Sequence, residues 1–180
     1  GDSTFFHAAM PALVDAVHHK SDVMLVVLDN SGTAMTGFQP HPGIEEDASG
    51  APAEVVDIES VCRAVGAEVV VGDPFEVEAT EEMLVSLLER QGPRVAILRQ
   101  SCALSPHKRS EPRYRMTVRQ DVCIGENCGC NRMCTRVFRC PGLFWDAERS
   151  SARIDEVICT GCGVCAVVCP SGAITKMEAV

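Results

Sequence analysis

The feature that most constrains the fold of this chain is a run of closely spaced cysteines near its C-terminal end. Residues 159–170 read CTGCGVCAVVCP, which places four cysteines in the pattern CxxCxxCxxxCP. This pattern is typical of iron–sulfur ligation. Three thiolates from one tight loop bind one 4Fe-4S cube, and the fourth cysteine binds the other cube of a two-cluster protein. The run therefore predicts a second set of cysteine ligands elsewhere in the sequence.

That second set lies upstream and is less regular. The CP ending recurs, because Pro141 follows Cys140 as Pro170 follows Cys169. The two stretches form an internal repeat, which predicts a ferredoxin-like domain with crosswise ligation. Cluster 2 would be bound by Cys140 together with Cys159, Cys162 and Cys165. Cluster 1 would be bound by Cys169 and three of Cys123, Cys128, Cys130 and Cys134. One of Cys128 and Cys130 is therefore surplus, and the spacing does not decide which.

A zinc site and a disulfide framework are the alternatives for these cysteines. Zinc ribbons use two CxxC pairs and lack the CP ending. Disulfides are disfavoured because nine of the eleven cysteines crowd into residues 123–169. The other two, Cys62 and Cys102, are expected to be small apolar core residues.

Charge and hydropathy restrict the partners. The net charge of -9 argues against nucleic acid, since phosphate contacts need a basic surface. No apolar run approaches the roughly 20 residues of a membrane span. Many reduced cysteines in an acidic chain predict a cytoplasmic, reducing location. The length of 180 residues allows one full domain and a small one.

The first hundred residues alternate between helical and strand patterns, which predicts an α/β domain with a parallel sheet. Helices are expected at 4–19, with Ser3 as N-cap, at 55–65 and at 83–88. Strands are expected at 23–28, buried on both faces, at 68–71 and at 95–98. The long polar stretch 30–52 is a candidate functional loop. We expect domains at 1–104 and 117–180, joined by a linker at 105–116.

Two hard oxygen donors are expected at one edge of this sheet. Asp2 begins the first helix and Asn30 follows the first strand. Ligands of parallel sheets bind at the carboxyl ends of the strands. A carboxylate and an amide oxygen suit Mg²⁺, and the start of a helix suits a phosphate. The pair therefore predicts a diphosphate bound through Mg²⁺.

The segment GDSTFFHAAMPALVDAVHHKSDVMLVVLDNSGTAMTGFQPHPG resembles the thiamine diphosphate motif of the 2-oxoacid:ferredoxin oxidoreductases, in the large (α) subunit of the indolepyruvate type. The resemblance continues through RQSCAL to the end of the chain. It implies a pyrophosphate-type thiamine diphosphate domain, followed by an α+β two-cluster bacterial ferredoxin-like domain. It implies Mg²⁺ ligation by Asp2, Asn30 and the carbonyl of Gly32. Cofactor contacts are implied for Ser3, Thr33, Thr36 and Gly37, and His7 is a candidate to face the cofactor or the substrate.

The same resemblance implies a reaction and partners. The reaction is the oxidative decarboxylation of an aryl-2-oxoacid to acyl-CoA and CO₂, with coenzyme A as co-substrate. Electrons pass through two 4Fe-4S clusters to an external ferredoxin. The family adds a small β/γ-type partner subunit, giving a hetero-oligomer, and a pyrimidine-binding domain that is not in these 180 residues. We expect the chain to be the C-terminal portion of a longer α subunit; the alternative is that another chain supplies that domain.

Two other functions remain open on the residues alone. The first is an electron-transfer module without a thiamine site of its own. The second is a related 2-oxoacid oxidoreductase with a different substrate, because the residues that select the substrate side chain would lie partly outside this sequence.

Overall fold

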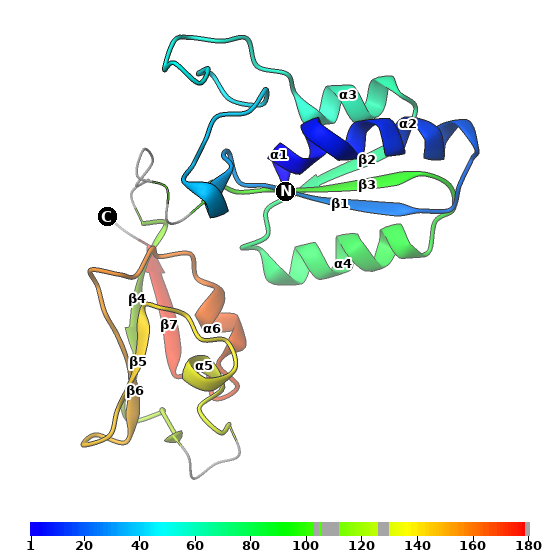
Figure 1. Cartoon of the computed structure of the whole chain (residues 1–180). Coiled ribbons are helices and arrows are strands. Elements are labelled where there is room, and N and C mark those ends of the chain that lie inside the picture. The colour runs from blue at the N-terminus through cyan, green and yellow to red at the C-terminus, as the bar shows by residue number, and fades with distance from the viewer. Residues whose placement is uncertain (103–104, 106–111, 126–129, 179–180) are drawn as a thin grey trace. The chain divides into compact units, whose positions relative to one another are not determined.

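A computed structural model of the chain describes residues 1–102, 105, 112–125 and 130–178. The chain divides into two compact units, Gly1–Lys108 and Arg109–Val180, and each is described here by itself (Figure 1). The division falls within the expected linker, 105–116. The last residues of the expected linker belong to a strand, because β4 (Tyr114–Val118) begins before residue 116.

The first unit is built on a three-stranded parallel sheet. Its strands are β1 (Met24–Asp29), β2 (Glu68–Gly72) and β3 (Arg94–Arg99), in the order β1-β3-β2. The pairing sets Asp29 opposite Arg99, and Gly72 opposite Leu98. All three strands therefore end at one edge of the sheet, where their loops can form a shared site.

The expected burial of the first strand on both faces is wrong. Val26 is 38 % exposed and Leu28 is 54 % exposed, whereas Val95, Ala96 and Ile97 of β3 are fully buried. The physical reason is the strand order, because β3 lies in the centre and β1 has only one neighbouring strand among the described residues. The burial on both faces that a continuous apolar run predicts is found in β3 instead.

The first helical segment runs without a break from Asp2 to His18. It consists of α1 (Asp2–Thr4), a π-helical turn η1 (Phe5–Ala9) and α2 (Met10–His18). The prediction of Ser3 as N-cap is wrong, since the helix begins at Asp2 with Gly1 at the cap position. Ser3 lies inside the first turn because the Asp2 carboxylate accepts its backbone N–H. A π-helical turn inside a helix is often found at functional sites.

The other helices depart from their predicted bounds for local reasons. Helix α3 (Ile58–Ala64) begins later than expected, because the Asp57 carboxylate caps it by accepting the Ser60 N–H at 2.7 Å. Helix α4 (Val77–Leu88) begins earlier than its apolar pattern, over a stretch rich in glutamate. In Figure 1, α1, α2 and α3 lie on one face of the sheet and α4 lies on the other.

Burial of apolar side chains fixes the first helices against the sheet. The core of this unit joins Phe5 and Leu13 from the first helix, Ile58 and Cys62 from α3, and the inward-facing residues of the strands. A short 3₁₀ turn, η2 (Ala34–Thr36), lies in the loop after β1. Because Phe5 is only 1 % exposed, the start of the helix is held firmly beside the carboxyl end of β1.

Within its described residues, the second unit has two antiparallel strand pairs and two short helices. Strand β4 pairs with β7 (Ile174–Glu178), and β5 (Leu143–Asp146) pairs with β6 (Ser151–Ile154). The helices are α5 (Met133–Arg136) and α6 (Val164–Val168). Along the chain, the order strand, helix, strand thus occurs twice, as β4-α5-β5 and β6-α6-β7. The core of this unit comprises Met116, Leu143, Cys165 and Ile174.

Within the described parts of the chain, no helix combines the length and the apolar character needed to cross a lipid bilayer.

Candidate cofactor site and cysteine sets

The Asp2 carboxylate is the centre of the candidate cofactor site. It is 1 % exposed, and it accepts three backbone N–H groups. Its Oδ1 accepts from Ser3 at 2.8 Å, and its Oδ2 accepts from Asn30 at 3.1 Å and from Gly32 at 3.2 Å. The start of the first helix and the loop after β1 are therefore joined by one buried side chain.

The Asn30 side chain completes a compact group of polar atoms. One terminal atom of its amide lies 3.2 Å from Asp2 Oδ1, 3.1 Å from Asp2 Oδ2 and 2.7 Å from the carbonyl oxygen of Gly32. With the amide nitrogen at that place, Asn30 donates to these oxygens. With the amide oxygen there, oxygens from three residues face one another, and which orientation holds depends on what they bind.

These oxygens fit a magnesium ion. Octahedral Mg²⁺ binds oxygens at about 2.0–2.1 Å, which sets neighbouring ligand oxygens about 3 Å apart. The observed separations match that spacing, and carboxylate, amide and carbonyl oxygens are the hard ligands that Mg²⁺ prefers. Groups of three His, Cys, Asp or Glu side chains able to hold a metal ion are absent from the described residues. A site of one carboxylate, one amide and one backbone carbonyl has a different composition.

His41 belongs to the same site, and the sequence reasoning did not identify it. Its Nε2 lies 3.1 Å from Asp2 Oδ2, with both side chains almost completely buried. The only signal available was its place in the motif segment, in QPHPG. No periodicity distinguishes a buried histidine in a long polar loop.

The remaining predicted cofactor residues lie around this centre without converging on it. Thr33 and Thr36 form a tight turn with Gln39, and Gly37 closes it with a positive φ of 117° that favours glycine. Ser3 is half-buried in the first turn. His7 is exposed on the π-helical turn and does not line the neighbouring cavity, so the structure does not bring it to the site.

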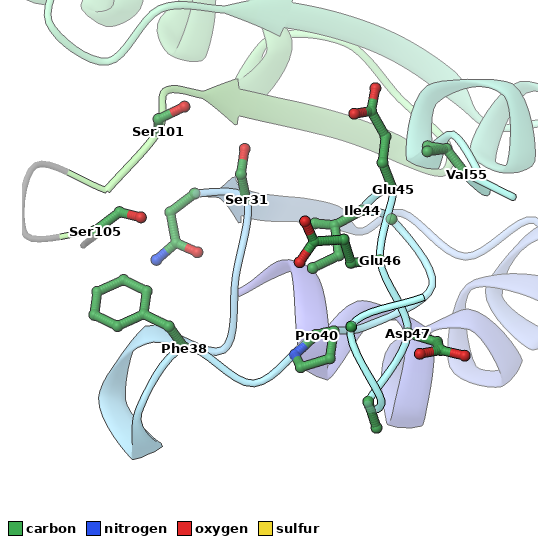
Figure 2. Close-up of a pocket in the computed structure, with 14 residues that line it drawn as sticks. Ser31, Phe38, Pro40, Ile44, Glu45, Glu46, Asp47, Val55, Ser101 and Ser105 are labelled. Atoms are coloured by element: carbon green, nitrogen blue, oxygen red, sulfur yellow. The ribbon is translucent and has the colours of Figure 1, made fainter. Parts of the chain in front are cut away.

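A cavity of about 480 Å³ opens beside Asn30. Figure 2 shows Phe38 and Ser105 on one side of it and the segment Glu45–Asp47 on the other. Val55, which was expected in a helix, lines it from the loop before α3. The size suits a small organic ligand.

The cysteines predicted for cluster 2 lie together in the second unit. Burial raises the pKa of Cys165 to about 12, and the nearby thiols of Cys162, Cys140 and Cys159 add to this effect. Burial also raises the pKa of Cys140, with further contributions from Cys162 and Cys159. These interactions place Cys140 beside the cysteines of the downstream run, as crosswise ligation requires.

The cysteines predicted for cluster 1 form a second set. Burial raises the pKa of Cys134, and the thiols of Cys169 and Cys123 raise it further. These three cysteines and Cys130 line one small cavity. Cys130 Sγ also donates to the Gly125 carbonyl at 2.9 Å. The other candidate, Cys128, lies outside the described residues.

Cys169 has surroundings suited to a thiolate. Burial opposes its ionisation, but the Ser171 hydroxyl and backbone N–H groups of residues 171, 173 and 174 lower its pKa. Hydrogen bonds to sulfur are one way in which proteins tune iron–sulfur clusters. Of the cysteines that the structure describes, none forms a disulfide.

Two family models match the chain. The model of the thiamine pyrophosphate enzymes, for their C-terminal TPP-binding domain, matches residues 1–97. The model of the 4Fe-4S binding domain matches residues 152–175. The first covers the unit that contains Asp2 and Asn30, and the second covers the downstream cysteine run.

Curated relatives match along nearly the whole chain. The Pyrococcus horikoshii protein named indolepyruvate oxidoreductase subunit IorA is 42 % identical over 185 residues, which cover 99 % of this chain and 27 % of the relative. Proteins of the same name from Archaeoglobus fulgidus and Methanothermobacter thermautotrophicus are 41 % and 42 % identical over 97 % of the chain. The chain spans about a quarter of the length of these relatives. No solved structure matches it.

Proposed function

Since the chain belongs to the thiamine pyrophosphate enzymes, we propose that it is the part of a 2-oxoacid:ferredoxin oxidoreductase that binds the diphosphate of thiamine and carries the electron-transfer clusters. The substrate class that we propose is an aryl-2-oxoacid of the indolepyruvate type, as the name of the relatives suggests. The products would be acyl-CoA and CO₂, with coenzyme A as acyl acceptor and an external ferredoxin as electron acceptor.

The observation that carries this proposal is the buried meeting of Asp2, Asn30 and Gly32 at the carboxyl end of β1. Asp2, Asn30 and the Gly32 carbonyl would hold Mg²⁺. The first helical turn with Ser3 would face the diphosphate, and the turn with Thr33, Thr36 and Gly37 would line the same side. When bound, thiamine diphosphate supplies an electron sink for loss of CO₂ from a 2-oxoacid.

The chain's own residues orient the carboxylate that would hold Mg²⁺. The Asp2 side chain accepts three backbone N–H groups, those of Ser3, Asn30 and Gly32. The cavity beside Asn30 leaves room for the organic part of the cofactor or for the substrate. We propose that a pyrimidine-binding domain, from a longer α subunit of which this chain is the C-terminal portion, completes the pocket.

The cysteine sets explain why the proposed reaction is oxidative. Iron–sulfur cubes carry one electron at a time, and a simple decarboxylase has no use for them. We propose Cys123, Cys130, Cys134 and Cys169 as ligands of cluster 1, and Cys140, Cys159, Cys162 and Cys165 as ligands of cluster 2. In a cube, each iron takes one protein thiolate, so four thiols surround the cluster rather than converge on one point.

An assay on the intact cytoplasmic hetero-oligomer, with its small partner subunit, tests the function. Acid denaturation should release thiamine diphosphate, and anaerobic turnover of indolepyruvate with coenzyme A should reduce a ferredoxin or a dye. Clusters without thiamine in well-loaded protein would instead establish an electron-transfer module. Aldehyde as the sole product, with no dye reduction, would establish a non-oxidative decarboxylase.

Substrate profiling tests the finer proposal. Indolepyruvate and phenylpyruvate should be turned over in preference to pyruvate and 2-oxoglutarate. A preference for pyruvate would leave the oxidoreductase intact and overturn the aryl assignment.

A further inference from the structure

His41 is a buried ionisable side chain to which the proposed function gives no role. We infer that His41 is a positioning residue for Asp2: its Nε2–H holds Asp2 Oδ2 so that Asp2 Oδ1 faces the metal. This inference rests on the proposed function, because it concerns the Mg²⁺ that the Asp2 site would bind.

The tautomer of His41 follows from its other contact. The backbone N–H of Gly43 donates to His41 Nδ1 at 3.0 Å, so Nδ1 bears a lone pair. The ring proton of the neutral imidazole is therefore on Nε2, which lies 3.1 Å from Asp2 Oδ2. The side chains of His41 and Asp2 are 1 % and 2 % exposed, so no water competes for this contact.

The contact is close but poorly aligned. His41 Nε2 has no hydrogen-bond partner despite the 3.1 Å separation, because the N–H does not point straight at the oxygen. Leaving a buried donor without a partner is unfavourable. The inferred role of His41 requires that the Asp2 carboxylate reorients when it binds a metal and thereby completes this hydrogen bond.

The two oxygens of Asp2 have different surroundings. Oδ2 accepts the N–H groups of Asn30 and Gly32 and also faces His41. With the Asn30 amide oxygen turned toward Asp2, Oδ1 accepts only the N–H of Ser3 and keeps a lone pair for a further ligand. Groups that orient a metal-binding carboxylate in this way typically change metal affinity by about 10- to 100-fold when removed.

Phe6 and Gly43 lie against the ring of His41. Phe6 stacks on it, with ring centroids 5.5 Å apart and planes 29° apart. At Gly43, a Cβ atom would come within 2.8 Å of Phe6 Cε2 and 3.0 Å of His41 Cε1, so a larger residue would displace the ring. Phe6 lies in the π-helical turn η1, shortly after Asp2. The aromatic ring that stacks on His41 and the carboxylate that His41 faces therefore come from one continuous helical segment.

Two variants separate the donor from the rest of the ring. In His41→Gln, the amide nitrogen can take the place of Nε2 and donate to Asp2. In His41→Asn, the shorter amide can replace only Nδ1 as acceptor for Gly43. The intact complex is freed of cofactor and re-equilibrated with thiamine diphosphate at increasing Mg²⁺, and the thiamine retained after gel filtration is measured by thiochrome fluorescence.

We expect His41→Asn to raise the half-saturating Mg²⁺ concentration by about 10- to 100-fold. His41→Gln should lie closer to the wild type. Cluster EPR signals and the hydrogen-exchange protection of β3 should be unchanged in both variants, which excludes a general loss of structure. The same Mg²⁺ requirement in all three proteins overturns the inference. Equal loss in both variants also overturns it, because the ring would then act by packing alone.

Failure of the proposed function has a different signature. In that case the wild type retains no thiamine diphosphate at any Mg²⁺ concentration, and both proposals fall. Normal retention in the wild type with unchanged variants removes only the role of His41.

Discussion

Replacing Asp2 tests the buried centre of the site and separates two roles of this carboxylate, as acceptor for backbone N–H groups and as proposed ligand of Mg²⁺. Asp2→Ala removes the acceptor for three N–H groups, those of Ser3, Asn30 and Gly32. A buried donor left without a partner costs about 1–3 kcal/mol, and the loop can admit water, so the lower end applies. The expected loss of stability in the first unit is therefore about 3 kcal/mol. For a unit of this size, that loss lowers the melting temperature by about 12 °C.

Asp2→Asn is the matched control. Its remaining oxygen can still accept from Asn30 and Gly32, so only the Ser3 N–H loses its partner, at about 1 kcal/mol. The missing charge removes the metal ligand in both variants. We therefore expect Mg²⁺-dependent thiamine diphosphate retention to be abolished in both, while the loss of stability differs about threefold between them.

Hydrogen exchange followed by mass spectrometry measures the loss of stability in the intact protein, because peptides covering β1 and β3 report the opening free energy of the first unit alone. EPR of the reduced clusters reports the second unit and should be unchanged. Unaltered protection of β3 in Asp2→Ala would refute the organising role of the carboxylate. Loss of the clusters in either variant would show that the damage is not local.

Three further predictions concern the rest of the chain. Cys130→Ser should remove the EPR signal of one cluster and halve the iron content, whereas Cys128→Ser should leave both unchanged, since Cys130 shares a cavity with three other cysteines; the opposite pattern would contradict this ligand set. Ile97→Ala should destabilise the first unit by about 2–5 kcal/mol in a urea titration, because Ile97 is fully buried in the central strand; a loss below 1 kcal/mol would contradict its central position. Burial raises the pKa of Cys62 from 9.0 to about 11, so between these values the unfolded chain loses a proton that the folded chain keeps, and stability falls as the pH rises. The urea midpoint should therefore fall less between pH 8 and pH 10 in Cys62→Ala than in the wild type. An identical fall in both proteins would contradict a contribution from Cys62.

Local patterns predicted the strands and the meeting of Asp2 with Asn30. The apolar run that ends at Leu98 needs burial, and it forms the central strand β3. Parallel strands end at one edge, so a helix start and a strand end could be placed together without knowing the strand order. Whether Asp2 and Asn30 bind Mg²⁺ remains a prediction.

Features that depend on contacts distant in sequence were not predictable. Strand β1 pairs with β3, which lies about 70 residues further along the chain, and this pairing exposes Leu28. Ser3 has the side chain of a good N-cap, but the tertiary role of Asp2 places the helix start two residues earlier. His41 gives no local signal because Asp2 and Phe6, the side chains that it contacts, lie more than thirty residues away in sequence.

The exchange of thiols between the two halves of the second unit has a consequence for assembly. Cys169 comes from the downstream half and lies with Cys134, whereas Cys140 comes from the upstream half and lies with Cys165. Each proposed cluster would therefore join residues from both halves, so the two cubes would act as two cross-links between the halves. Neither half-repeat, expressed alone, contains four thiols of one proposed set, so cluster insertion would have to wait until both halves have been synthesised and have folded together.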